Sequence, residues 1–243
     1  MTRLSVNINK IGTLRNARGG NRPDLVEAAV RIQEFGADGI TIHPRPDQRH
    51  IRYSDVDRLK EVIHTEYNIE GYPSEEFIAL VLKTKPDQVT LVPDPPGVLT
   101  SNAGWDVKGR KDLLQDVIAQ FKEAEIRTSL FMETDLDQIE SAKETGADRI
   151  ELYTGPYAEN YSKNPENAVA PFIKAALHAQ NIGLELNAGH DLDMDNLNFF
   201  VSKIPIIKEV SIGHALISDA LYFGLENIVN MYKRQLLVHE TEL

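Results

Sequence analysis

GADGITIHPR, the stretch from Gly36 to Arg45, contains the unit from which this chain is built. It opens on a glycine of the kind that ends a helix, because glycine adopts the left-handed backbone conformation at low cost. An apolar, β-branched run typical of a buried strand follows, and His43 comes directly after it. The opening residues have a close copy from Gly146 to Ile150. This unit predicts a helix-to-strand turn, a strand, and polar side chains at the strand's carboxyl end.

The same alternation of strand and helix patterns extends over the whole chain. The expected strands are residues 3–9, 38–43, 67–71, 87–92, 126–131, 148–153, 183–187 and 207–213. Between them lie amphipathic stretches with apolar residues every three or four positions, as in a helix with one face on a core. Strands that alternate with helices pair in parallel through βαβ crossovers. We therefore expect an α/β fold built on a parallel sheet.

The number of strands favours a closed barrel over an open, doubly wound sheet. Eight strand–helix units account for a chain of 243 residues with no excess for a second domain, and a (β/α)8 barrel usually has about 250 residues. Polar, charged or glycine residues end the strands, which suits a site at one mouth of a barrel. We predict one TIM-barrel catalytic domain over residues 1–243.

Two long connections and one terminal helix complete the expected architecture. Residues 93–107 follow the fourth strand and are rich in Pro and Gly, and we interpret them as a lid because long loops on this face often close over substrates. Residues 155–167 are expected to form a second long loop. A last helix is expected to carry four apolar residues on one face: Leu221, Leu225, Ile228 and Tyr232.

Composition excludes several classes of protein. The chain has no cysteine, which rules out disulfides, thiolate metal sites and a cysteine nucleophile. Its net charge of −11 argues against general nucleic-acid binding, which depends on neutralising phosphates. No apolar run approaches the roughly 20 residues that span a bilayer, and residues 1–7 lack the apolar core of a signal peptide. We expect a cytoplasmic protein.

Positive charge is concentrated near the N-terminus of this acidic chain. Residues 1–52 carry nine Lys or Arg against five Asp or Glu. Side chains two apart in a strand point the same way, so Asn7 and Asn9 are expected to face the barrel mouth together. Lys10, Arg15 and Arg18 add positive charge beside them. Such a basic region suits small anionic ligands, because arginine donates two hydrogen bonds at once to a phosphate.

A second basic segment, from Ile42 to Arg52, follows the second expected strand. His43 stands at the strand's carboxyl end, where an imidazole is well placed to transfer protons near neutral pH. Three arginines, including Arg45, and a second histidine, His50, follow within nine residues. The proline-stiffened loop predicts an anion clamp at the barrel mouth.

Three further strand ends carry candidate functional groups. Glu70 lies between apolar neighbours at the end of the third strand, where burial or a nearby charge could tune its protonation. Gly189 lets the chain turn after the seventh strand and present His190. Gly213 and His214 end the eighth strand, where the amino end of a helix would bind phosphate. Together these positions predict acid–base chemistry on a phosphorylated substrate.

The motifs in these segments resemble the pyridoxine 5'-phosphate synthase family. VNINKIGTLRNAR, from Val6 to Arg18, is the most specific of them. ADGITIH from Ala37 to His43, NAGH from Asn187 to His190 and IGHA from Ile212 to Ala215 agree with it. The resemblance runs nearly from end to end of the chain, so no single short motif carries it.

The resemblance implies a TIM barrel with extra helices, assembled as a homo-octamer. It implies an enzyme that condenses 3-amino-2-oxopropyl phosphate with 1-deoxy-D-xylulose 5-phosphate. The products would be pyridoxine 5'-phosphate, phosphate and water, in the ring-closing step of one route to vitamin B6. The family needs neither a metal nor an organic cofactor.

The resemblance also assigns roles to individual residues. His43 and Glu70 would act as bases and His190 as an acid. Contacts to the aminoketone phosphate would come from Asn7, Arg18, Asp191, Gly213 and His214. Contacts to the deoxyxylulose phosphate would come from Asn9, Lys10, Arg45, His50 and Thr100.

At three of these positions the chain departs from the commonest family pattern. Asn9 and Lys10 replace a frequent Asp-His pair, and Asp191 replaces a frequent glycine. Asn9 can still hydrogen-bond a hydroxyl group but cannot act as a base. Lys10 keeps a positive charge near a phosphate, and a contact through the backbone N–H of Asp191 would survive the change.

Three other functions remain open from the residues alone. A TIM-barrel metallohydrolase could use His43, Glu70, His190 and His214 as ligands, because their types permit it. A Schiff-base aldolase could use Lys10. The third is a non-catalytic phosphometabolite-binding protein. The basic loops speak against the first, because they would repel a cation.

Overall fold

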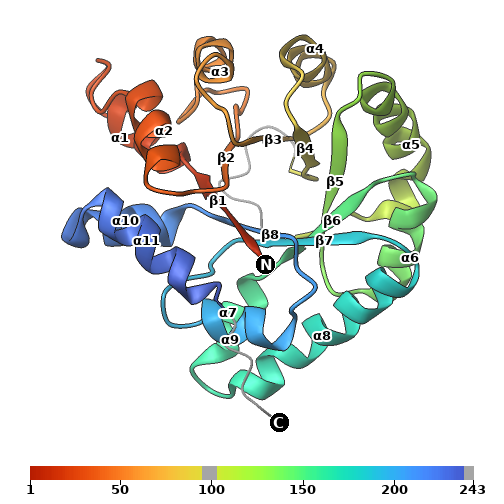
Figure 1. The fold of residues 1–243 in the computed structure, drawn as a ribbon. Helices are drawn as coiled ribbons and strands as arrows, with labels where there is room; N and C mark the ends of the chain where they lie inside the picture. Colours follow the sequence, from red (N-terminus) through yellow and green to blue (C-terminus); the bar gives the residue numbers. More distant parts are fainter. Residues whose placement is uncertain (95–102, 238–243) are drawn as a thin grey trace.

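The computed structural model describes residues 1–94 and 103–237. Eight parallel strands close into a barrel in which each strand pairs with its neighbours in sequence and β1 pairs with β8. Figure 1 shows the helices arranged around the outside of the strands. The fold is therefore the (β/α)8 barrel that the sequence predicts.

The strands lie close to their expected positions. Their bounds are β1 (Arg3–Asn7), β2 (Gly39–Ile42), β3 (Glu66–Gly71), β4 (Gln88–Leu91), β5 (Arg127–Met132), β6 (Arg149–Tyr153), β7 (Glu185–Gly189) and β8 (Glu209–Ile212). All the residues of β2, β4 and β8 are buried. This burial explains why β-branched and apolar residues predominate in these strands, since a parallel sheet is covered on both faces.

Eleven helices occur in the described part of the chain, so the barrel carries more than one helix per strand. They are α1 (Asn9–Asn16), α2 (Leu25–Glu34), α3 (Tyr53–Lys60), α4 (Glu75–Thr84), α5 (Val107–Glu123), α6 (Leu136–Glu144), α7 (Gly155–Tyr161), α8 (Pro165–Asn181), α9 (Leu197–Lys203), α10 (His214–Phe223) and α11 (Leu225–Gln235). Several begin at a side chain that accepts hydrogen bonds from free backbone N–H groups, as Asp24, Ser74 and Asp135 do. Such caps fix where each helix starts.

Three local expectations from the sequence are wrong. The first strand ends at Asn7, and Asn9 begins helix α1, so these two residues do not share a strand. Residues 155–167 form α7 and the start of α8 and are not a long loop. The last helix is broken at Gly224, whose positive φ of 80° ends α10 and leaves Leu221 exposed.

Charged and polar side chains fill the amino end of the barrel, because seven strands begin with one. Arg3 Nη1 lies 2.7 Å from Glu66 Oε2, and Arg127 pairs with the same carboxylate. Arg149 Nε lies 2.8 Å from Glu185 Oε2. We call these five first residues of strands the amino-end ion network. The side chains of Glu66 and Arg149 are only 7% and 6% exposed, so the network closes this end of the barrel.

No helix among the described residues is long and apolar enough to cross a membrane. Residues 95–102, which form most of the expected lid, lie outside the described residues. The flanking part of that connection is well anchored, because Trp105 is buried and donates from Nε1 to the carbonyl of Leu91 at 2.9 Å.

Candidate active site

A cavity of about 660 Å³ opens at the carboxyl ends of the strands. It is lined by Asn7, Asn9, Lys10, Thr13, His43, Arg45, Arg49, His50, Glu70, Val92, Phe131, Glu151, His190, Asp191, Ser211, Gly213 and His214. These residues come from all eight strands or from the connections that follow them. Eleven of the candidate residues meet in this one cavity, which is the usual place for a TIM-barrel active site.

Two candidate residues do not meet there. Arg18 is exposed, follows α1 and does not line the cavity, and its contact to substrate stays a prediction. Thr100 lies outside the described residues.

The asparagines of the first segment organise the backbone around the cavity. Asn7 Oδ1 accepts a hydrogen bond from the backbone N–H of Asn9 at 3.0 Å. Asn9 Oδ1 accepts one from the backbone N–H of His43 at 2.9 Å. Asn7 Nδ2 in turn donates to Glu70 Oε2 at 3.4 Å. The start of α1 thereby connects the carboxyl ends of β1, β2 and β3.

Helix α1 also fixes the basic loop through Arg15, a side chain that the sequence predicted to bind anions. Arg15 is fully buried; its Nη1 lies 2.7 Å from Asp55 Oδ1, and its Nη2 donates to the carbonyl of His50 at 3.0 Å. A Cβ on Gly12 would lie only 2.5 Å from that carbonyl oxygen, so the helix and the loop pack too closely for any other residue. Arg15 is therefore a structural residue that shapes the basic loop.

His43 and Glu70 form the centre of the cavity. His43 Nδ1 lies 3.9 Å from Glu70 Oε2, and both side chains are largely buried. Burial, with a smaller effect of the positive charges of Arg45 and Arg49, lowers the pKa of His43 well below its usual value. The imidazole is thus neutral at physiological pH, which is the form that can accept a proton.

Glu70 is tuned in the opposite direction. Burial raises the pKa of the Glu70 carboxyl to about 7, although Arg45 and a hydrogen bond with Ser211 oppose that shift. A carboxyl group that titrates near the working pH can both accept and return a proton. The pair is therefore able to move protons in either direction.

A second buried carboxylate, Glu151 on β6, was not predicted from the sequence. One of its oxygens, Oε2, is buried and has no hydrogen-bond partner among the residues that the structure describes. Burial and the nearby charge of Glu70 raise the pKa of Glu151 well above its usual value, which favours the protonated form of its carboxyl group. The sequence did contain a signal for this site residue, because Glu151, like Glu70, follows an isoleucine within an expected strand.

The turn after β7 presents His190 together with the residue that follows it. His190 Nδ1 lies 2.7 Å from Asp191 Oδ2. The ring of Tyr153, at the end of β6, packs edge-on against the His190 ring with centroids 5.1 Å apart. His190 is thus held on one side by a carboxylate and on another by an aromatic ring.

The opposite wall of the cavity is formed by the start of α10. A Cβ on Gly213 would lie 3.0 Å from the Cβ of Asn7, so glycine allows the ends of β8 and β1 to approach. Ser211 and His214 line the same wall. The free N–H groups of the first helical turn and the helix dipole favour an anion at this position.

The basic loop forms the other end of the cavity. Arg45 and Arg49 line it and also line an adjoining hollow of about 290 Å³. Arg45 Nη2 lies 3.5 Å from Asp94 Oδ2. Burial and the two arginines lower the pKa of His50 to about 4, so its ring is neutral. The positive charge at this end therefore comes from the arginines and the exposed Lys10.

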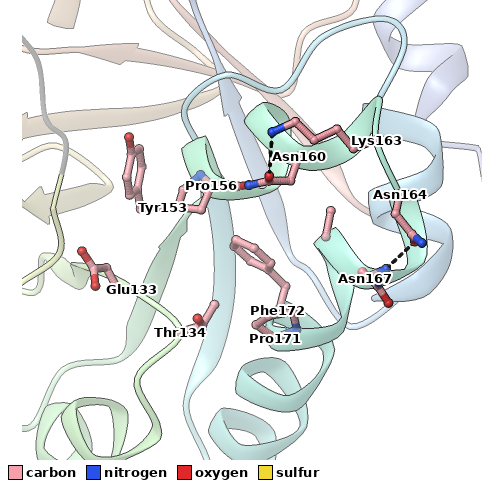
Figure 2. A pocket seen from close by; sticks show the side chains of 11 residues that line it. Glu133, Thr134, Tyr153, Pro156, Asn160, Lys163, Asn164, Asn167, Pro171 and Phe172 are labelled. Atoms are coloured by element: carbon pink, nitrogen blue, oxygen red, sulfur yellow. Dashed lines mark hydrogen bonds between the residues drawn. The ribbon is translucent and has the colours of Figure 1, made fainter.

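A separate groove of about 510 Å³ lies beside the barrel mouth, between α7, α8 and the connection after β5. Figure 2 shows Phe172 and Tyr153 facing into it, with Lys163 and Asn160 joined by a hydrogen bond at its rim. None of the candidate site residues lines this groove. Tyr153 is the link between the groove and the cavity, because its ring also packs against His190.

The four histidine and carboxylate side chains considered as metal ligands do line the cavity. Within residues 1–94 and 103–237, however, no group of three or more such side chains has the arrangement that could hold a metal ion. His43, Glu70, His190 and His214 thus lie around the cavity without converging on one point.

Comparison with known proteins agrees with this arrangement. The family model described as "Pyridoxal phosphate biosynthesis protein PdxJ" matches residues 4–238. The chain belongs to this family. It is 61% identical to the pyridoxine 5'-phosphate synthase of Bacteroides thetaiotaomicron, covering 96% of this chain and 98% of the relative. It is 59% identical to the enzyme of the same name from Porphyromonas gingivalis, covering 97% and 99%.

Solved structures with low sequence identity share the fold. Tryptophan synthase from M. tuberculosis superposes with a TM-score of 0.68 at 12% identity, covering 98% of this chain and 93% of that one. Phosphoribosylanthranilate isomerase from Thermotoga maritima gives 0.61 at 14% identity, covering 97% and 98%. These similarities support the barrel architecture.

Proposed function

We propose that this chain is a pyridoxine 5'-phosphate synthase, a ring-closing enzyme of vitamin B6 biosynthesis. It condenses 3-amino-2-oxopropyl phosphate with 1-deoxy-D-xylulose 5-phosphate. The observation that carries the proposal is the pairing of a neutral His43 with Glu70, 3.9 Å apart, in a cavity with an anion-binding feature at each end. Family membership and relatives of about 60% identity support it.

The chemistry explains why these groups are needed. Joining an amine to a ketone, eliminating water and phosphate, and closing an aromatic ring all require protons to be removed and delivered in turn. His43 and Glu70 act as bases, and His190 delivers a proton as an acid. Bases and an acid that surround one cavity can do this without the loss of intermediates.

The two phosphates bind at the two ends of the cavity. The start of α10, with Gly213 and His214, takes the phosphate of the aminoketone together with Asn7. The basic loop, with Arg45 and His50, takes the phosphate of the deoxyxylulose substrate. Holding both substrates at once converts a bimolecular reaction into an effectively unimolecular one.

Glu151 adds a fourth group that can carry a proton in this cavity. Its protonated carboxyl can donate a hydrogen bond to an oxygen that becomes negative during the condensation. Its position against Gly189, where a Cβ would lie 2.2 Å from Glu151 Oε1, keeps the carboxyl fixed.

The alternative functions receive less support from the site. Lys10 is exposed, whereas lysines that form Schiff bases are usually desolvated. A metallohydrolase is not favoured, because among the described residues His43, Glu70, His190 and His214 do not converge on one point. A protein that only binds metabolites has no need for a buried Glu70 with a pKa of about 7.

We further propose a single catalytic domain over residues 1–243 that works in the cytoplasm as a homo-octamer. The resemblance of the sequence supports the octamer. Helix α10 ends in three exposed apolar residues, Leu221, Tyr222 and Phe223, whose exposed fractions are 74%, 86% and 54%. Such a patch is typical of a subunit interface. Native mass spectrometry of the purified chain tests the subunit number, and a monomer would contradict it.

The activity is tested by mixing chelator-treated protein with both substrates and following pyridoxine 5'-phosphate by absorbance and mass. We expect product without added metal. A folded protein that forms no product, with or without metal, would overturn the proposal. His43→Ala, Glu70→Ala and His190→Ala should each slow product formation greatly, and a near-normal rate in one of them removes that residue from the scheme.

A further inference from the structure

The turn after β7 contains a costly backbone conformation at two consecutive residues. His190 and Asp191 have positive φ values of 78° and 59°. This left-handed region disfavours residues with a Cβ, and glycine is the residue normally found there. Strained residues of this kind persist where the surrounding structure imposes them, and they cluster at functional sites.

Hydrogen bonds from two neighbouring elements impose this conformation. Thr154, which follows β6, donates from its backbone N–H and from its hydroxyl to the carbonyl of Gly189, at 3.0 and 2.7 Å. The same hydroxyl is also close to the carbonyl of His190. Asn196 Nδ2 donates to the carbonyl of Asp191 at 3.2 Å. The backbone of the turn is therefore fixed from both sides, and with it the direction of both side chains.

The side chains so fixed form a carboxylate–imidazole pair. Asp191 Oδ2 lies 2.7 Å from His190 Nδ1. The hydrogen bond with His190, and the nearby charges of His190 and His214, lower the pKa of Asp191, so it is a carboxylate at neutral pH. A carboxylate only accepts hydrogen bonds, so the proton in this contact lies on Nδ1. The other ring nitrogen, Nε2, is then the one that gains and loses protons.

We propose that Asp191 is a positioning residue that acts through His190. Its carboxylate holds the imidazole in the Nδ1–H tautomer, so that Nε2 exchanges the proton with the substrate. Tyr153 supports this orientation by packing edge-on against the same ring. The role of the side chain is separate from any contact that the backbone N–H of Asp191 makes to a phosphate. The inference rests on the proposed function insofar as His190 is the acid of that reaction.

The test combines a spectroscopic measurement with kinetics. Nitrogen-15 spectra of the histidine rings in the substrate-free protein report which ring nitrogen carries the proton. We expect the Nδ1–H form for His190 in the unaltered protein. In Asp191→Asn the amide can donate to Nδ1 as well as accept from it, so we expect a mixture or the opposite tautomer. We expect kcat to fall about 10–100-fold, as when groups that orient an imidazole are removed, with little change in KM for either substrate.

Three further variants separate this role from a general effect on the turn. Asp191→Gly removes the carboxylate from a backbone that glycine adopts without strain, so it should fold normally and lose kcat. Asp191→Glu retains a carboxylate and should recover part of the kcat. Asp195→Asn removes the same charge from an exposed position in the same connection, and it should leave both tautomer and kcat unchanged.

The outcomes distinguish the inference from the proposed function. An unchanged His190 tautomer in Asp191→Asn overturns the inference, whatever the activity. An equal loss of kcat in Asp195→Asn also overturns it, because the effect would then come from charge alone. A normal kcat in His190→Ala overturns the acid role of His190. The tautomer of the His190 ring in the substrate-free, unaltered protein still tests the contact with Asp191.

Discussion

The two ends of the barrel use the same residue types in opposite ways. At the amino end, Glu66 lies between arginines, and Arg3 Nη1 is 2.7 Å from its Oε2. At the carboxyl end, Glu70 and Glu151 are also largely buried, and burial raises the pKa of both carboxyl groups. The amino end pairs most of its charges, although burial and the charge of Glu66 raise the pKa of Glu209 there to about 8. The carboxyl end instead keeps carboxyl groups that gain and lose protons within the cavity.

The difference shows how one strand serves both ends. β3 begins with Glu66 and ends next to Glu70, and β6 begins with Arg149 and carries Glu151 two residues later. A strand of five or six residues thus carries one charged group for each end. We infer that stability and chemistry are separable along the barrel axis, which the following changes test from the largest expected effect to the smallest.

Glu70→Gln should abolish most of the activity. The amide keeps the size of the side chain but cannot accept a proton, so we expect kcat to fall about 10²–10⁴-fold, the usual contribution of a general base. Steady-state formation of pyridoxine 5'-phosphate measures it. The matched control is Glu123→Gln at an exposed position on α5. A kcat for Glu70→Gln close to that of the control would show that the reaction does not depend on the Glu70 carboxyl group.

Glu66→Ala should have the converse effect. It leaves Arg3, Arg127 and Arg149 without their shared carboxylate, and removing one partner of a buried ion pair costs about 3–5 kcal/mol. Urea denaturation measures the free energy of unfolding, and kcat per folded enzyme should change little. Glu66→Gln, which keeps the shape, serves if the alanine variant does not fold. A loss of kcat without a loss of stability would contradict the separation of the two ends.

Glu70→Gln should also stabilise the protein at high pH. The pKa of Glu70 rises from 4.5 to about 7 on folding, so the folded state holds a proton that the unfolded state has lost. The free energy of unfolding therefore falls as the pH rises from about 4.5 to 7. Removing the group should raise that free energy at pH 8 by about 1–3 kcal/mol. The gain should vanish at pH 4, and a gain independent of pH would refute the assignment.

Lys83→Met should have the smallest effect. Lys83 Nζ lies 2.5 Å from Asp57 Oδ2, but the side chains are 67% and 51% exposed. An exposed ion pair contributes roughly 0–1 kcal/mol, so urea denaturation should give nearly the same free energy of unfolding as the unaltered chain. A loss comparable to that of Glu66→Ala would mean that exposure does not separate these two kinds of ion pair.

Much of the fold and of the cavity could be predicted from the sequence. The strands of a parallel barrel are buried on both faces, so their apolar runs stand out. The candidate groups His43, Glu70 and His190 follow or end such runs, and parallel strands bring their carboxyl ends to one mouth. The positions of polar residues at the ends of the predicted strands therefore predicted that residues far apart in the chain meet in one site.

The failures have a common physical reason, which is that long-range partners decided them. Arg15 resembles an anion-binding residue until Asp55, forty positions later, is placed beside it. Helix α1 has few apolar residues and is stabilised by its packing against the basic loop, so its pattern gave no strong helical signal. Glu151 was overlooked because its role depends on the nearby charge of Glu70 on another strand.

The protonated carboxyls of the cavity also affect how substrates arrive. The chain carries a net charge of −11, which repels phosphorylated molecules at long range. While Glu70 and Glu151 hold protons, they add no charge to that repulsion, and the positive charges of Arg45, Arg49 and Lys10 line the same cavity. Association should therefore be fastest below the pKa of Glu70, about 7, and should slow as its charge appears. The ionisation that makes Glu70 a base thereby also slows the encounter with substrate.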